Sequence, residues 1–131
     1  MRISIASSLL SITLAATTNF AEDWPQWRGA ARDGISPETG LLSSWPDAGP
    51  PLVWKSRGLG AGYSTVTISG GRIFTLGASK DTAYVFALDV ETGKTLWRAK
   101  SGRHYRNNRG DGPRGAPTVD GNRVYALGGR G

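Results

Sequence analysis

The sequence predicts an all-β chain of short antiparallel strands, and three features carry this prediction. Glycine supplies 19 of the 131 residues, about twice its usual share of ~7%. The glycines separate runs rich in Val, Ile, Tyr and Phe, the residues that strands favour. After residue 22 no run shows the hydrophobic period of an amphipathic helix. Strands joined by tight turns are therefore expected throughout.

Residues 1–21 have the pattern of a signal peptide for export. Arg2 gives a positive start, and an uncharged, mostly apolar stretch follows it. Its many Ser and Thr residues make a retained membrane span the weaker alternative. Cleavage after Ala21 is expected, although Asn19 is larger than the small residue usual at that place, which leaves cleavage at 16–18 as an alternative. The mature protein is expected in the periplasm or secreted, without a membrane span.

Charge and cysteine content narrow the classes of partner and anchor. The formal net charge of +6 comes from 16 Lys and Arg against 10 Asp and Glu. This moderate excess favours solubility over nucleic-acid binding in an exported protein, so no nucleic-acid partner is expected. The sequence has no cysteine. Packing must then replace disulfides, and a lipid-modified cysteine anchor is excluded.

Residues 22–51 are predicted to form an extended, turn-filled clasp over a folded body. The segment is rich in Trp, Gly and Pro and has no long periodic run. Trp24, Trp27 and Trp45 each carry about 150–250 Å² of surface, which favours their burial against the body. The alternative is a ligand-binding role for Trp24 or Trp27.

A repeated unit follows the clasp. Thr67–Gly77 (TISGGRIFTLG) and Thr118–Gly128 (TVDGNRVYALG) share five of eleven residues at an offset of 51. Gly-Gly at 70–71 and Gly-Asn at 121–122 divide each copy into two short strand-forming runs. Both copies are therefore predicted to be β-hairpins.

Two more strand-forming runs, at 84–88 and 95–99, follow the first hairpin. They complete a blade of four consecutive antiparallel strands over 63–99. Because these strands are apolar on both faces, both sides of the blade need cover. Blades stacked around an axis supply that cover, and the predicted architecture is a β-propeller of four-stranded blades.

The propeller region is assigned to residues 52–131. Leu52–Lys55 is predicted to be a strand of a preceding or ring-closing blade, and 115–131 the first half of a second blade. A propeller needs about four to eight blades, whereas about one and a half are present. The sequence is therefore expected to be a fragment of a longer protein.

The stretch from Ala87 to Trp97 has the spacing A-x-D-x-x-T-G-x-x-x-W. Asp89 and Thr92 are suited to hydrogen-bond the turn, and Gly93 is free to take a positive φ. Trp97 is predicted to place its ring between adjacent blades and to donate its indole N–H to a neighbouring carbonyl. These five positions are predicted to form a structural docking motif.

This spacing resembles the tryptophan-docking motif of the pyrroloquinoline quinone (PQQ) repeat propellers. The runs DWPQWRG at 23–29 and DGISP at 33–37 are similar to the opening segment of the same family. The resemblance implies either a binding scaffold or a dehydrogenase that uses PQQ with calcium. Quinone-binding members generally have adjacent cysteines, which are absent here, and no acid of this sequence matches their calcium ligands or base.

The function expected from the sequence is an exported PQQ-like propeller that acts as a binding or assembly scaffold. Its partner would be a protein, a small molecule or a carbohydrate. The alternative is a PQQ-dependent dehydrogenase of alcohols or sugars, so whether the protein is an enzyme stays open. No catalytic residue and no metal ligand is assigned, because the lone His104 lacks a partner for either role.

The connection from the first blade to the second, residues 101–114, is strongly basic. It carries Arg103, His104, Arg106 and Arg109. Such a connection lies on a rim of the propeller, where these four residues are predicted to bind an anionic ligand. The alternative is a solvated basic loop.

Overall fold

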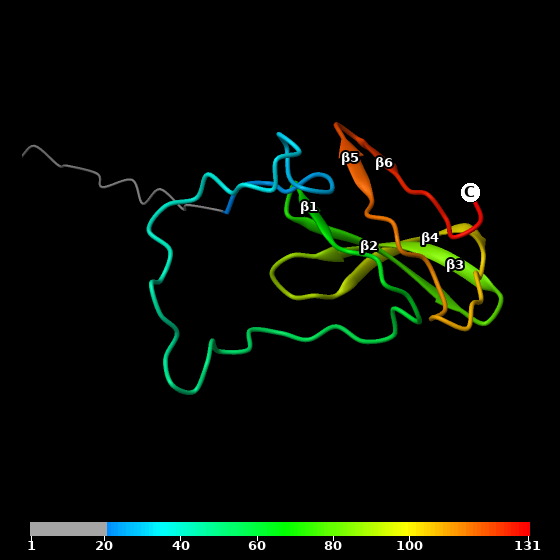
Figure 1. The fold of residues 1–131 in the computed structure, drawn as a ribbon, viewed down its shortest axis with the longest axis horizontal. Coiled ribbons are helices and arrows are strands. Elements are labelled where there is room, and N and C mark those ends of the chain that lie inside the picture. Colours follow the sequence, from blue (N-terminus) through cyan, green and yellow to red (C-terminus); the bar gives the residue numbers. More distant parts are fainter. Residues whose placement is uncertain (1–20) are drawn as a thin grey trace, which may run out of the picture.

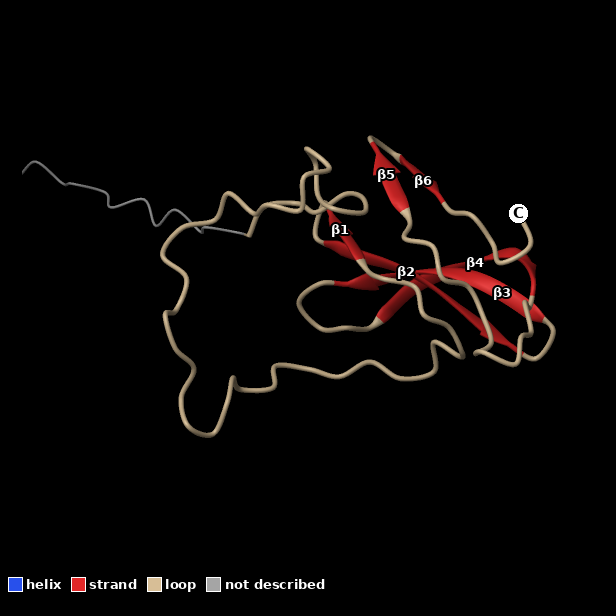
Figure 2. Cartoon of the chain, viewed as in Figure 1, coloured by secondary structure: helices blue, strands red, loops and turns tan. Residues whose placement is uncertain are grey.

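The computed structural model describes residues 21–131, and this part of the chain is all-β (Figure 2). The predicted signal peptide lies outside the described residues, apart from Ala21. The strands are β1 (Thr67–Ser69), β2 (Arg72–Ser79), β3 (Thr82–Asp89), β4 (Thr95–Arg103), β5 (Thr118–Asp120) and β6 (Arg123–Tyr125). The predicted all-β class is confirmed. Residues 21–131 contain no helix that could cross a membrane.

Strands β1 to β4 form one antiparallel sheet in chain order, and β5 and β6 form a separate antiparallel hairpin (Figure 1). The predicted run of four consecutive antiparallel strands is therefore confirmed. Its last strand is longer than expected, because β4 continues to Arg103 and pairs there with Thr82. Two register shifts, beside Ala83 and Ala87, allow this long edge strand to follow β3.

The two hairpins have the same register at the predicted offset of 51. Ile68 faces Ile73 in the first hairpin, and Val119 faces Val124 in the second. Gly70 and Gly71 take φ values of 58° and 71°. Two successive positive φ values are what a two-residue hairpin turn with the right-handed twist of its strands requires.

The core lies on β2 and β3. Its apolar members are Phe74, Leu76, Ala78, Ala83, Val85, Phe86, Ala87 and Leu88. Successive residues of a strand point to opposite faces, so this continuous run means that both faces of the sheet are covered. Strand β4 is different, since most of its residues are exposed at the sheet edge.

The start of the clasp joins the two hairpins. Trp24 and Ile68 exchange backbone hydrogen bonds of 2.8 and 2.9 Å, and Val119 N–H donates to Pro25 O at 2.7 Å. Ile68 and Val119 are equivalent positions of the repeat. Asp23 adds a cap, because its carboxylate accepts from the Ser69 hydroxyl at 2.8 Å and from the turn that follows. The first clasp residues therefore act as a strand segment between β1 and β5.

One expectation for the lead-in region is wrong, the burial of all three clasp tryptophans. Trp27 and Trp45 are 65% and 63% exposed, so only Trp24 of the three clasp tryptophans packs inward. Figure 1 shows the cyan-to-green chain making a wide excursion away from the sheet. Leu52–Lys55 pairs with no strand among residues 21–131, and its predicted place in a preceding or ring-closing blade stays a prediction.

Candidate functional site

The basic connection between β4 and β5 is the predicted ligand site, and the structure divides its residues into two groups. Arg103 belongs to β4 rather than to the loop. His104 and Arg106 face the β2–β3 turn, whereas the Arg109 side chain is exposed. The four predicted residues are therefore not gathered around one point.

His104 and Arg106 fasten the loop to the turn at Lys80 and Asp81. The Nδ1–H of His104 and a guanidinium N–H of Arg106 both donate to Lys80 O, at 2.6 and 3.0 Å. Arg106 also pairs with the Asp81 carboxylate at 3.0 Å. This pair is exposed and contributes at most about 1 kcal/mol. Since Arg106 already has an anionic partner, it is a poor receptor for a ligand.

The middle of the loop is ordered by its own polar groups. Asn107 N–H donates to the Asp111 carboxylate at 2.9 Å, and its side-chain amide donates to the Tyr105 hydroxyl at 2.8 Å. Arg109 N–H donates to the Asn107 side-chain oxygen at 2.9 Å. These bonds hold Tyr105 against the loop and leave the Arg109 guanidinium in solvent.

Arg114 is the cation that the sequence-based prediction left out. Its guanidinium carbon lies 5.7 Å from the centre of the Tyr63 ring and 5.8 Å from that of Tyr105. One N–H donates to Gly110 O at 2.8 Å. Two aromatic faces and one carbonyl thus orient an exposed guanidinium, which keeps its other donors.

A cavity of about 270 Å³ lies beside this guanidinium. Its lining, here called the Arg114 pocket, consists of Tyr105, Gly112, Arg114, Gly115, Leu127, Gly128 and Gly129. The glycines matter for its shape, because a Cβ on Gly129 would stand only 2.5 Å from Cβ of Tyr105. The pocket is therefore small, and its lining consists of one cation, the side chains of Tyr105 and Leu127, and four glycines.

The repeat offers a signal that identifies Arg114. It stands 51 residues after Tyr63, which is the offset of the two hairpins. The two repeats start side by side, as Tyr63 N–H donates to Pro113 O at 2.8 Å and the Ser64 hydroxyl donates to Gly115 O at 2.7 Å. The starts of the two repeats are thus in direct contact.

The docking motif forms the β3–β4 turn. One carboxylate oxygen of Asp89 accepts from Thr92 N–H at 2.8 Å and from its hydroxyl at 2.7 Å. These bonds lower the pKa of Asp89 from 3.8, with the Thr92 hydroxyl as the largest cause. Gly93 takes a φ of 66°, and Ala87 is fully buried below the turn.

Two further tryptophans, Trp54 and Trp97, contact the first sheet. The ring of Trp54 packs on Gly93, and its indole N–H donates to Val90 O at 3.0 Å. Trp97 is 42% exposed and its ring centre lies 6.0 Å from that of Phe74. Trp97 also borders a hollow shared with the β5–β6 hairpin. The predicted hydrogen bond from its indole N–H has no acceptor among residues 21–131.

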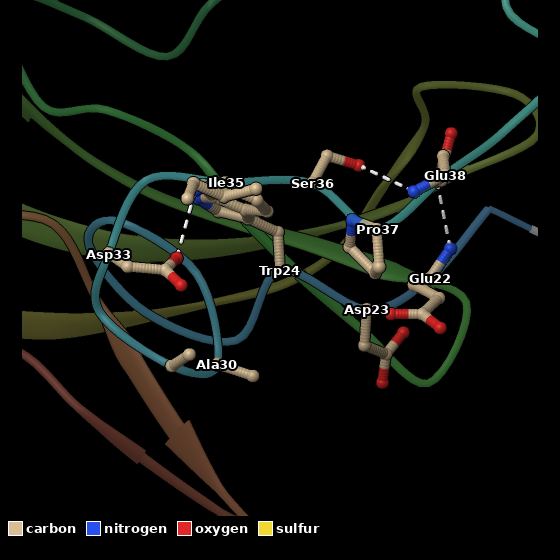
Figure 3. Close-up of a pocket in the computed structure, with 10 residues that line it drawn as sticks. Glu22, Asp23, Trp24, Ala30, Asp33, Ile35, Ser36, Pro37 and Glu38 are labelled. Atoms are coloured by element: carbon tan, nitrogen blue, oxygen red, sulfur yellow. Dashed lines mark hydrogen bonds between the residues drawn. The ribbon is translucent and has the colours of Figure 1, made fainter.

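A second cavity, of about 340 Å³, lies within the clasp (Figure 3). Its acidic lining residues are Glu22, Asp23, Asp33 and Glu38. Three of the four carboxylates accept hydrogen bonds that shape the clasp, including one from Glu22 N–H to Glu38 at 3.0 Å. No cluster suited to a metal ion occurs in the described part of the chain. Asp23, Asp33 and Glu38 therefore serve the fold of the segment.

Comparison with known proteins gives one partial similarity. The chain is 30% identical over 115 residues to tetrathionate hydrolase of Acidithiobacillus ferrooxidans, a match that covers 82% of this chain and 21% of that protein. The chain thus spans about a fifth of the length of this relative. No family model matches the chain, and no solved structure matches it.

Proposed function

We propose that this chain is the beginning of an exported β-propeller of PQQ-like repeats, which acts as a binding or assembly scaffold. The observation that carries the proposal is an aromatic contact to the first repeat unit from the segment that precedes it. Trp54, which precedes the first blade, packs on the turn of that blade at Gly93. Units that bury an aromatic anchor of their neighbour are typical of repeat proteins, in which a single unit cannot cover its own faces.

The arrangement of the hairpins supports the same proposal. They repeat with one register and meet at Tyr63 and Pro113, at the start of each unit. Further units, each related to the one before it as the second hairpin is to the first, would place their loops on a shared rim. A rim of this kind collects loops from several blades and suits the binding of a protein, a carbohydrate or a small molecule.

A hydrolase acting on an oxyanion such as tetrathionate is the second candidate. The similarity to tetrathionate hydrolase favours it, and the cationic Arg114 pocket suits an anionic ligand. A PQQ-dependent dehydrogenase with calcium remains the third, resting on the docking motif and the opening Trp segment alone. No residue among 21–131 is assigned as a ligand of PQQ or of calcium.

One set of measurements on the exported full-length protein separates the three. Its crystal structure is expected to contain a closed ring of four-stranded blades, with Trp97 on the turn of the following blade. The scaffold predicts a stable complex with another exported molecule, no dye reduction after loading with PQQ and calcium, and no consumption of tetrathionate. An open sandwich of sheets would contradict the architecture. Dye reduction would show that the protein is a PQQ-dependent dehydrogenase, and consumption of tetrathionate that it is a hydrolase, rather than a scaffold.

A further inference from the structure

The Arg114 pocket combines features that suit a small anion. The guanidinium of Arg114 is held by the rings of Tyr63 and Tyr105 and by Gly110 O. A held guanidinium loses less conformational entropy on binding than a free one. Its remaining N–H donors match the oxygens of an oxyanion, which a planar guanidinium contacts in pairs.

Charge at the pocket is uncompensated. Within residues 21–131 the only ion pair joins Arg106 to Asp81, so Arg114 has no carboxylate partner there. Asp111, the acid of this loop, has a carboxylate oxygen that accepts a bond from Asn107 N–H. The net charge of +5 on residues 22–131, from 15 Lys and Arg against 10 Asp and Glu, adds a general attraction for anions.

Two of the glycines that line the pocket, Gly128 and Gly129, have backbone N–H groups without an acceptor among the described residues. A volume of about 270 Å³ fits a small ion and its water better than a large cofactor.

We propose that the Arg114 pocket is a binding site for a small oxyanion, with Arg114 as its main receptor. The inference rests on the proposed function in one respect, that this rim faces ligands. It names the chemical class of the ligand, a compact group with several oxygens such as sulfate or the end of a thionate. It also moves the predicted anion site from Arg103, His104, Arg106 and Arg109 to a residue beyond them.

The test uses the full-length protein and isothermal titration with sulfate, thiosulfate and tetrathionate, with chloride as the reference anion. We expect saturable binding of one anion for each site, weakened by added salt because the site is exposed. Arg114→Gln should weaken binding about tenfold or more, since hydrogen bonds to charged groups are the strong ones. The affinity of Arg114→Lys should lie between those of the wild type and Arg114→Gln, because lysine keeps the charge and loses the planar fork of N–H donors.

Arg123→Gln is the matched control. Arg123 is exposed on β6 and does not line the pocket. Its substitution by Gln removes the same charge as Arg114→Gln. Leu127→Trp is a second probe, which keeps the charge and fills the cavity from a side chain that is 69% exposed. We expect unchanged binding in the control and loss of binding in Leu127→Trp.

Three results would overturn the proposal. The first is chloride binding as tightly as the oxyanions. The second is an equal loss in Arg114→Gln and Arg123→Gln, which would mean that only net charge matters. The third is normal binding by Leu127→Trp, which also decides the case if the Arg114 variants fail to fold. None of these results bears on the blade architecture, whose test is the crystal structure.

Discussion

The indole N–H of Trp54 donates to the carbonyl of Val90 at 3.0 Å, across 36 residues of sequence. The same ring occupies the space that a Cβ on Gly93 would need. A residue without a strand of its own is thereby fixed to the turn between β3 and β4. The turn therefore needs glycine at 93 for two reasons. The first is the positive φ of 66°, and the second is the Trp54 ring, which leaves no room for a Cβ.

Trp54→Phe should destabilise the full-length protein by about 1 kcal/mol, because it keeps a ring and loses the indole hydrogen bond. Chemical denaturation measures the change in unfolding free energy. Trp45→Phe is the control, since Trp45 is 63% exposed. Equal effects of the two substitutions would show that the bond to Val90 contributes nothing.

Gly93→Ala should cost more stability than Gly71→Ala, although both glycines have a positive φ near 70°. An L-residue in that conformation costs about 1–2 kcal/mol at either position. The two positions differ in the room for an added Cβ, which meets nothing within 4 Å at Gly71 and overlaps the Trp54 ring at Gly93. The difference in melting temperature isolates the ring contact, and identical melting of the two variants would contradict it.

Trp97→Ala should lower stability by about 2 kcal/mol, roughly half the loss for a fully buried Trp, because the ring is 42% exposed. The loss arises from its contact with Phe74 and from the hollow beside the β5–β6 hairpin. Trp27→Ala is the control for an exposed ring. Anion binding at the Arg114 pocket should be unchanged, and unchanged melting would refute the structural role of Trp97.

Asp89 should make the β3–β4 turn sensitive to acid. Its pKa is lowered from 3.8 because the Thr92 hydroxyl and N–H stabilise the carboxylate. The stabilisation is complete above pH 3.8, the unfolded-state value, and is lost as the pH falls through the lower folded-state pKa. Asp89→Asn should reduce this acid dependence in denaturation curves, whereas Asp47→Asn, in the exposed part of the clasp, should not. Parallel curves for Asp89→Asn and the wild type would contradict the assignment.

We expect export to be accompanied by cleavage after Ala21, so that the mature protein begins at Glu22. The Glu22 nitrogen lies 3.0 Å from a carboxylate oxygen of Glu38, and cleavage after Ala21 would turn this amide into an ammonium group. An α-amino group is protonated at neutral pH, so the hydrogen bond would become an ion pair. Mass spectrometry of the exported protein measures its first residue, and a start at residues 17 to 19 would contradict the prediction.

Glu38→Gln tests the ion pair itself. It should lower the melting temperature of protein that begins at Glu22 more than that of protein that retains the preceding residues. Only the processed form has the ammonium group that the carboxylate would pair with. An equal effect on both forms would leave the contact an ordinary hydrogen bond.

Much of the fold was predictable because its signals are local. Glycine pairs mark both hairpin turns, and the strand-forming runs between them set the order of β1 to β4. The offset of 51 predicted that the second hairpin would have the register of the first. The pattern D-x-x-T-G likewise contains its own turn, since Asp89, Thr92 and Gly93 interact within a few residues.

The candidate site was less predictable, because it depends on contacts between distant segments. A count of cations in the basic loop pointed to Arg106, yet Asp81 neutralises that residue from another turn. Arg114 lies in the same loop but was left out of the predicted site, and only the structure shows that the ring of Tyr63, 51 residues earlier, contacts its guanidinium. The tryptophans show the same limit, since only packing distinguishes the partly buried Trp24 from the exposed Trp27.

By itself, the sequence determined the all-β class, the hairpin turns, the repeat and its register, since turn chemistry and strand propensity act between near neighbours. Tertiary structure alone decided that Trp54 anchors the β3–β4 turn, that the clasp joins β1 to β5 at Ile68 and Val119, and that Arg114 faces a pocket. Those features need two segments to meet in space. The free energy of such a contact depends on the shape and charge of both segments. The local sequence of one segment therefore does not predict which distant segment it will contact.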